Sequence, residues 1–177
     1  MAVQIGAKPD SGFEDPIGML TDCHRRIEQF LNILATVAER VSGRGLTGEE
    51  AAAVQAALQY FRTGGVRHTA DEEESLFPRL RAETESGSMA KLDALEADHE
   101  TAAALHEAVE QIYFEWLKNG APSSERETEL RAAMERLKGL YQAHIAVEES
   151  VVFPQAAKVL DRATIASIGQ EFRARRA

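Results

Sequence analysis

The chain has 177 residues, and its 20 basic and 29 acidic side chains give it a net charge of −9. This length predicts one domain, and the single cysteine excludes an intrachain disulfide and a multi-cysteine metal site. A chain this acidic lacks the basic surface of nucleic-acid-binding proteins and is repelled by anionic membranes. No apolar run approaches the ~20 residues of a membrane-spanning helix, and no secretory signal is recognisable. We therefore expect a cytoplasmic protein without nucleic-acid or membrane partners.

Helix-boundary signals recur along the whole chain, whereas strand signals are nearly absent. In chain order, the expected helices cover about residues 16–40, 48–80, 88–118, 124–159 and 162–172. This pattern predicts an all-α fold: an antiparallel up-down-up-down four-helix bundle with a short C-terminal fifth helix. The expected divisions are an irregular arm at 1–14, the bundle at 15–160, and the short helix with a basic tail at 161–177.

Short polar motifs mark the ends of these helices. Thr47 with Glu50, and Ser124 with Glu127, fit the capping box, in which two side chains bind the free backbone N–H groups of a helix start. Asp161 is expected to cap the fifth helix. A polar turn is predicted at residues 85–88.

Two segments of the chain repeat each other without gaps. HTADEEESLFP occupies residues 68–78, and HIAVEESVVFP occupies residues 144–154. Two further histidines, His24 and His99, precede these two segments by almost the same length of chain. The chain therefore reads as two helical hairpins of one design, each with a histidine followed by His-x-x-x-Glu.

The repeated residues are predicted to meet in one layer of the bundle. Residues i and i+4 share a helix face, so each His-x-x-x-Glu pair projects together. His24 and His99 fall within apolar seams, and a rise of ~1.5 Å per residue places all four helices' groups about 13–20 Å from one end of the bundle. Two carboxylates at core positions need partners, because a buried unpaired charge is very costly. The candidate metal ligands are His24, His68, Glu72, His99, His144 and Glu148.

This ligand set favours a pair of metal ions. Four imidazoles and two carboxylates are too many for one tetrahedral zinc ion, and they suit iron, manganese or zinc better than calcium or magnesium. Each ion would take two histidines, and the two glutamates would bridge both ions. Positions would remain open for water, O2 or another small ligand.

These residues, with Phe-Pro after each His-x-x-x-Glu pair, resemble the hemerythrin-like, or HHE cation-binding, domain over about residues 15–160. The resemblance implies an antiparallel four-helix bundle with a non-haem di-iron centre that binds O2, NO or peroxide, or that senses iron or redox state. The two iron ions would be bridged by carboxylates and by an oxo or hydroxo group, with manganese or zinc as substitutes. Carried over by residue, the terminal ligands are His24, His68, His99 and His144, and the bridging carboxylates are Glu72 and Glu148.

The sequence departs from the oxygen-carrying hemerythrins in two places. Ala103 stands where those proteins have a second histidine one turn after the first, and the last motif has Glu148 at i+4 in place of an aspartate at i+5. The pattern looks more like the iron-sulfur-repair and iron-sensing branches, although the cysteine-bearing N-terminal region of repair proteins has no match here.

The expected function is binding of O2 or a related molecule for sensing, storage or detoxification. The alternatives are a di-iron redox enzyme (peroxidase, catalase-like, NO-reducing or iron-sulfur repair) and an interaction module controlled by metal or redox state.

Several residues near the predicted site are expected to have structural roles and not to bind metal. Asp71, Glu73 and Glu74 are expected on a solvated face, with bonds from Glu73 and Glu149 to neighbouring helices as the alternative. His106 is expected to be a core or outer-sphere residue. Tyr141 is expected to pack in the core, with lining of the metal pocket as the alternative. Phe61, Phe114 and Trp116 are expected in the core, and the basic tail at 173–176 is expected to be a frayed helix end.

Overall fold

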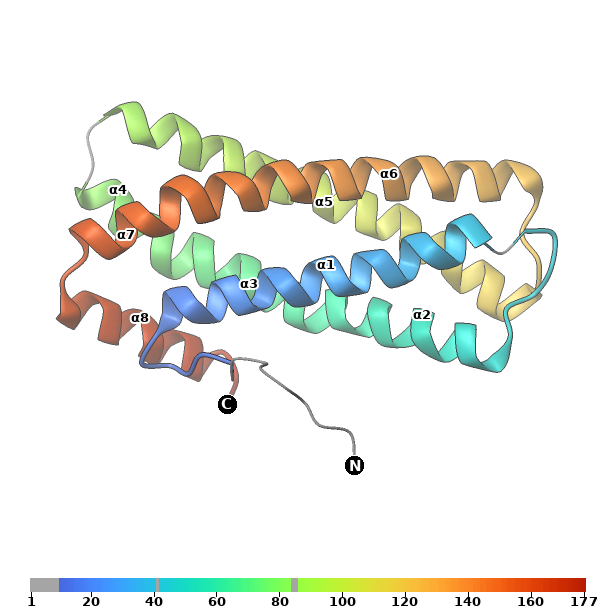
Figure 1. Cartoon of the computed structure of the whole chain (residues 1–177), viewed down its shortest axis with the longest axis horizontal. Coiled ribbons are helices and arrows are strands. Elements are labelled where there is room, and N and C mark those ends of the chain that lie inside the picture. Colours follow the sequence, from blue (N-terminus) through green and yellow to red (C-terminus); the bar gives the residue numbers. More distant parts are fainter. Residues whose placement is uncertain (1–9, 41, 84–85) are drawn as a thin grey trace, which may run out of the picture.

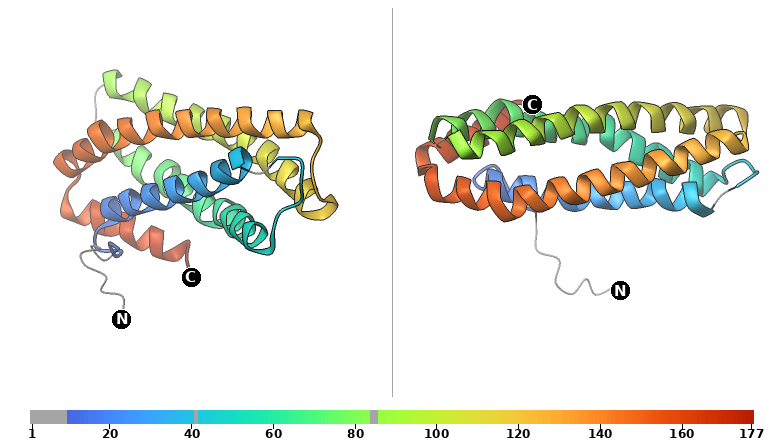
Figure 2. Two further views of the ribbon diagram at one scale, coloured as in Figure 1. Left: turned by 45° about the vertical axis from the view of Figure 1, so that its right-hand side comes forward. Right: turned by 90° about the horizontal axis from the view of Figure 1, so that it is seen from above.

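The computed structural model describes residues 10–40, 42–83 and 86–177, and all regular structure within these ranges is helical. The predicted all-α class is therefore confirmed. Long helical rods lie side by side in every view, with a short helix across one end (Figures 1 and 2). Within the same ranges, no helix is long and apolar enough to cross a membrane.

The second and fourth rods combine α-helical segments with π-helical segments, which are labelled η, whereas the first and third rods are single α-helices. The first rod is α1 (Pro16–Arg40), and the third is α5 (Ser86–Asn119). The second rod, residues 48–83, comprises α2 (Gly48–Tyr60), η1 (Phe61–Gly65), α3 (Val66–Ala70), η2 (Asp71–Leu76) and α4 (Phe77–Glu83). The fourth rod, residues 124–159, comprises α6 (Ser124–Val147), η3 (Glu148–Val152) and α7 (Phe153–Val159), and α8 (Arg162–Ala174) follows it.

The polar turn predicted at 85–88 is wrong over the residues that can be compared. Residues 84–85 lie outside the described ranges, and α5 already begins at Ser86. Serine and glycine are tolerated in a first helical turn, because the backbone N–H groups there lack intrahelical partners.

The interior consists of two apolar clusters separated by a polar layer. On α1, Leu20 belongs to one cluster and Ile27 to the other; on α5, Leu95 and Ala102 are divided in the same way. Apolar residues at helical spacing face the interior on both sides of the layer, so the layer is closed off from solvent along the rod axes.

Two predicted helix caps are confirmed. Thr47 and Glu50 form the reciprocal capping box at the start of α2. The Asp161 side chain accepts a hydrogen bond from the backbone N–H of Thr164 at 2.8 Å and caps α8. These local motifs fix where the helices begin because they satisfy N–H groups that would otherwise be unpaired.

The capping box predicted at Ser124 and Glu127 is wrong. Ser123 is the N-cap of α6, and Glu127 turns to another segment of the chain. Its carboxylate accepts hydrogen bonds from the Ser42 hydroxyl at 2.6 Å and from the Gly43 backbone N–H at 2.7 Å. Gly43 has a φ of +66°, which glycine adopts without strain. Glu127 therefore fastens the loop after α1 to α6.

The C-terminal residues also differ from expectation. Asp71 is fully buried, with an Arg175 guanidinium nitrogen at 2.9 Å and an Arg176 nitrogen at 2.5 Å from its carboxylate. The predictions of a solvated Asp71 and of a frayed tail are therefore wrong. Asp71 aligns with Val147 in the second copy of the repeat, an apolar residue that is partly buried. The ion pairs hold α8 against η2 at one end of the bundle (Figure 1).

One aromatic residue expected in the core lies at the surface. Phe114 is 58% exposed, whereas Phe61 and Trp116 are buried as predicted. Tyr113 and Trp116 occupy the inward side of α5 near its end, which turns Phe114 outward. Val66, at 62%, is the other exposed large apolar side chain among the described residues.

The double replacement Arg175→Ala/Arg176→Ala should lower the free energy of unfolding by about 3–5 kcal/mol, because it leaves the buried Asp71 carboxylate without a counter-charge. Urea unfolding followed by circular dichroism measures this loss. Arg162→Ala, at an exposed position at the start of α8, is the matched control and should change stability by less than about 0.5 kcal/mol. Equal stability of the two variants would contradict the role given to the ion pairs.

Glu127→Gln should lower the free energy of unfolding at pH 7 by about 1–3 kcal/mol, because a charged acceptor is lost. Hydrogen bonds from the Gly43 N–H and the Ser42 hydroxyl lower the pKa of Glu127 in the folded protein. As the pH falls below the ordinary glutamate value of 4.5, the unfolded chain therefore takes up the proton first, and this stabilisation is lost.

The gap in stability between the wild-type protein and Glu127→Gln should accordingly narrow as the pH is lowered from 7 through 4.5. Urea midpoints at several pH values test this. Glu135→Gln, at an exposed position of α6, serves as the control. A gap that stays constant or widens in acid would show that the carboxylate charge is not what stabilises this loop.

Candidate metal centre

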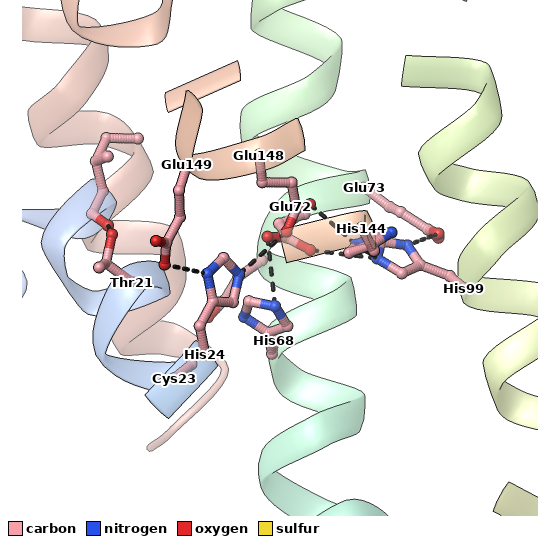
Figure 3. A network of polar contacts seen from close by, with 12 residues as sticks. Thr21, Cys23, His24, His68, Glu72, Glu73, His99, His144, Glu148 and Glu149 are labelled. Atoms are coloured by element: carbon pink, nitrogen blue, oxygen red, sulfur yellow. Dashed lines mark hydrogen bonds and ion pairs between the residues drawn. The ribbon is translucent and has the colours of Figure 1, made fainter. Parts of the chain in front are cut away.

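The six predicted ligands come together in the polar layer. Each rod contributes one histidine, and the two glutamates come from the π-helical segments η2 and η3 (Figure 3). The four histidines are His24 on α1, His68 on α3, His99 on α5 and His144 on α6.

The six side chains form two overlapping groups. His24 and His68 belong to one group and His99 and His144 to the other, and Glu72 and Glu148 belong to both. In each group the candidate ligand atoms all lie within 4.8 Å of one another. The internal repeat of the sequence is thus reproduced in space as two half-sites that share two carboxylates.

Each glutamate directs one oxygen toward each half-site. Glu148 Oε2 lies 3.0 Å from His24 Nε2, and Glu148 Oε1 lies 3.2 Å from His144 Nε2. One carboxylate therefore faces imidazoles that come from different rods and different halves of the repeat.

Glu72 has the equivalent arrangement. Its Oε1 lies 3.4 Å from His68 Nε2, and its Oε2 lies 3.4 Å from His99 Nε2. The His99 and His144 Nε2 atoms are themselves 3.1 Å apart. Nitrogen and oxygen donors thus converge from several directions on a small central volume.

The centre is buried and its polar atoms are not satisfied by the protein. Glu72 and Glu148 are 0% exposed, and the His99 side chain, at 9%, is the most exposed of the six. All four carboxylate oxygens of the two glutamates, and His24 Nε2, lack a hydrogen-bond partner within the described residues. Unpaired buried carboxylates are destabilising, so this donor set fits a bound cation.

The proton affinities of the centre reflect the same burial. Burial and the nearby Glu148 carboxylate raise the pKa of Glu72 well above its ordinary value. Burial also acts on Glu148, but the adjacent His144 and His24 imidazoles outweigh it and lower the pKa of Glu148. Burial lowers the pKa of His68 to about 3, which keeps this imidazole neutral and able to donate a lone pair.

A second layer of carboxylates orients the imidazoles. Glu149 Oε1 lies 2.8 Å from His24 Nδ1, and Glu73 Oε1 lies 2.7 Å from His99 Nδ1. A carboxylate only accepts hydrogen bonds, so Nδ1 carries the proton and Nε2 presents its lone pair to the centre. The predicted alternative for Glu73 and Glu149, a bond to a neighbouring helix, is confirmed, and the Glu73 side chain is also 36% exposed.

The two halves differ in this second layer. Asp98 Oδ2 lies 3.3 Å from His144 Nδ1, whereas His68 Nδ1 has no hydrogen-bond partner within the described residues. Asp98 directly precedes His99, and the residue that directly precedes His24 in the other half is Cys23. The sequence interpretation missed Asp98, and the repeat gave no signal for it because the two copies differ at this position.

The π-helical turns recur at equivalent places of the repeat. Residues 71–76 form η2 and residues 148–152 form η3, each just after the histidine of its motif. Each of these turns carries two successive glutamates that point in different directions. Glu72 and Glu148 face the centre, whereas Glu73 and Glu149 contact a histidine of a neighbouring rod (Figure 3). A π-turn is a frequent feature of functional sites, because it changes the direction of consecutive side chains.

His106 and Tyr141 lie outside the two half-sites. The His106 Nε2 atom is 3.0 Å from the Tyr141 hydroxyl, and the Tyr141 ring lies 6.5 Å from the His144 ring between centroids. His106 is only partly buried and is not among the six grouped residues.

Comparison with known proteins agrees with this geometry. The chain is 27% identical over 164 residues to an uncharacterized protein of Haemophilus influenzae (strain KW20 Rd), and the match covers 93% of this chain and 91% of the relative. The hemerythrin HHE cation-binding domain family matches residues 15–156, which include all six grouped residues. Because this match spans most of the chain, the protein belongs to the hemerythrin HHE cation-binding domain family.

Proposed function

We propose that the six grouped residues bind two iron ions and that the resulting centre binds O2 or a related small molecule, NO or peroxide, for sensing, storage or detoxification. The observation that carries this proposal is the pair of overlapping ligand groups, each with two histidines and both glutamates. Two cations would offset the buried carboxylates and occupy the volume toward which the unpaired atoms point.

Iron is proposed on the chemistry of the donor set. Imidazole and carboxylate together suit iron, and manganese and zinc are the substitutes to be compared with it. When bound, iron supplies reversible one-electron chemistry and coordination positions for a small molecule. The protein's own residues hold the imidazole lone pairs inward, through Glu73 and Glu149, and exclude bulk water through the apolar clusters on both sides.

We also propose the antiparallel up-down-up-down order for the four rods. Figure 1 supports this order, because the loop from α1 to α2 and the loop from α5 to α6 lie at the same end of the bundle. The hydrogen bonds from the loop after α1 to Glu127 on α6 also lie at this end.

A redox enzyme is the second candidate, and one observation favours it. A cavity of about 540 Å³ opens beside His99, which gives a co-substrate a route to one half-site. Turnover assays with peroxide and with NO distinguish an enzyme from stoichiometric binding, since only an enzyme consumes many equivalents of either molecule.

The proposed function is tested by metal analysis and by visible spectra of the anaerobically reduced and the air-exposed protein. After iron-replete expression we expect about two iron ions per chain and absorption typical of an oxidised di-iron centre. Less than about one iron per chain, without such absorption, would contradict the proposal.

His68→Ala and Glu148→Ala should each reduce the bound iron to about half or less, because each removes a donor from at least one half-site. Iron per chain after anaerobic loading and desalting gives the readout. His106→Phe alters a nearby histidine outside both groups and should retain full loading. A fully loaded Glu148→Ala protein would mean that this carboxylate does not bridge the half-sites.

Glu149→Ala and Glu73→Ala should weaken metal affinity by about 10–100-fold, because each leaves an imidazole without the carboxylate that orients it. Competition with a chelator of known affinity measures the change. The control is Glu100→Ala, an exposed position one residue after His99 that contributes no ligand atom. An equal loss in all three variants would point to a general charge effect instead of orientation.

A further inference from the structure

One histidine and one tyrosine break the internal repeat. In the other half of the repeat, the residue equivalent to His106 is Leu31, and the residue equivalent to Tyr141 is Gly65. The hydrogen-bonded pair therefore exists on one side of the pseudo-twofold arrangement only, and neither member is among the grouped metal ligands.

This pair lines a cavity between α5 and the second rod. The cavity has a volume of about 540 Å³ and borders η1 on one side and the middle of α5 on the other. The helices diverge here, since α5 packs closely along α6 but only weakly along the second rod. Its wall is formed in large part by Phe61, Val66, Ala103, His106, Phe114 and Tyr141.

The volume is far greater than a diatomic ligand needs. A water molecule occupies about 30 Å³ in the liquid, whereas pockets for organic ligands span about 300–1,000 Å³. Val66 and Phe114, the two exposed large apolar side chains of the described residues, both lie on this wall. Exposed apolar groups gathered at one concave site are typical of a binding surface for an apolar molecule.

Charges at the cavity favour a neutral occupant over an anion. Arg62, a cation in the cavity wall, already donates hydrogen bonds to the Glu110 carboxylate, with its Nε at 2.6 Å. Glu107 and Glu110 are further members of the wall, so acidic groups outnumber the one arginine. A carboxylate or phosphate in the cavity would meet repulsion and no free counter-charge.

The His106–Tyr141 pair offers one spare hydrogen-bond donor. Burial lowers the pKa of His106 to about 4 and raises the pKa of Tyr141, so both groups are neutral at pH 7. Together they carry one imidazole N–H and one phenol O–H, and their mutual hydrogen bond uses one of these. Neither side chain has another hydrogen-bond partner among the described residues, so the second hydrogen is available whichever tautomer is present.

We propose that this cavity binds a neutral, mostly apolar organic molecule that carries one hydrogen-bond acceptor, such as a ketone or quinone carbonyl. The acceptor receives the spare hydrogen of the His106–Tyr141 pair, and the apolar body lies against Phe61, Val66 and Phe114. The site lies beside His99 but uses none of the six grouped ligands for the polar contact. It therefore stands whether or not the proposed iron assignment holds.

Three compounds with one naphthalene ring system test the proposal on the full chain. The compounds are 2-acetylnaphthalene, which has a ketone, 2-ethylnaphthalene, which has no acceptor, and 2-naphthoate, which is an anion. Calorimetric titration should give one site, with the ketone binding about 5–10-fold more tightly than the ethyl compound. The anion should bind more weakly than both because its charge would be buried unpaired.

Matched variants locate the site. Ala103→Trp fills the cavity and should abolish binding, whereas Ala104→Trp, at the adjacent exposed position outside the wall, should leave binding unchanged. The double variant His106→Phe/Tyr141→Phe removes both donors and keeps the apolar wall, so the ketone and the ethyl compound should bind to it equally. Circular dichroism confirms that each variant is folded.

Titrations are run on the metal-free and the iron-loaded protein, with iron content measured on the same samples. Binding of the ketone by the metal-free protein supports the proposal even if iron loading fails. No binding by the folded protein would overturn it. The proposal would also be overturned by tighter binding of the anion, by equal loss of binding in the two tryptophan variants, or by a ketone preference retained in His106→Phe/Tyr141→Phe.

Discussion

The rest of the structure depends on two carboxylates buried between four imidazoles. Glu72 and Glu148 are wholly enclosed, and their oxygens have no hydrogen-bond partner in the described part of the chain. Two buried carboxylates without a counter-charge are costly, and a bound cation would remove this cost. The outer carboxylates, the π-turns and the two apolar clusters are therefore best understood as parts that position and enclose a cation site. Family membership in a cation-binding domain is consistent with this reading.

Much of this arrangement was predictable, because it follows from repetition and helical periodicity. The repeat selected six residues, and i,i+4 spacing with shared helix ends placed them in one layer, as found. Contacts between segments remote in sequence were not predictable. Asp71 was predicted to be solvated because it lies in a run of acidic residues. No local sequence signal indicates that Arg175 and Arg176 form ion pairs with it. Likewise, Glu127 has capping-box spacing to Ser124, but its stronger partners come from the loop after α1.

The two half-sites have the same ligands but different surroundings. His144 has a carboxylate at its Nδ1 atom, and His68 has none because Cys23 stands at the equivalent position. The cavity with the His106–Tyr141 pair adjoins His99, in the half-site to which His144 also belongs. A carboxylate partner makes an imidazole a stronger donor, so two ions bound here would differ in electronic environment and in access. One of the two ion positions would therefore be more accessible than the other.

Several contacts of the bundle join residues that are far apart in the sequence, and this constrains the order in which the newly synthesised chain can fold. His24 touches Glu149, 125 residues later, and Asp71 is neutralised by Arg176, 105 residues later. Chains emerge from the ribosome N-terminus first, so the first half-site's histidines and Glu72 are synthesised well before their shared partner Glu148. During that interval Asp71 lacks its counter-charge, so its burial within the first hairpin would be costly. A metal site that needs both halves of the repeat would therefore be completed late, after the C-terminal arginines have been synthesised.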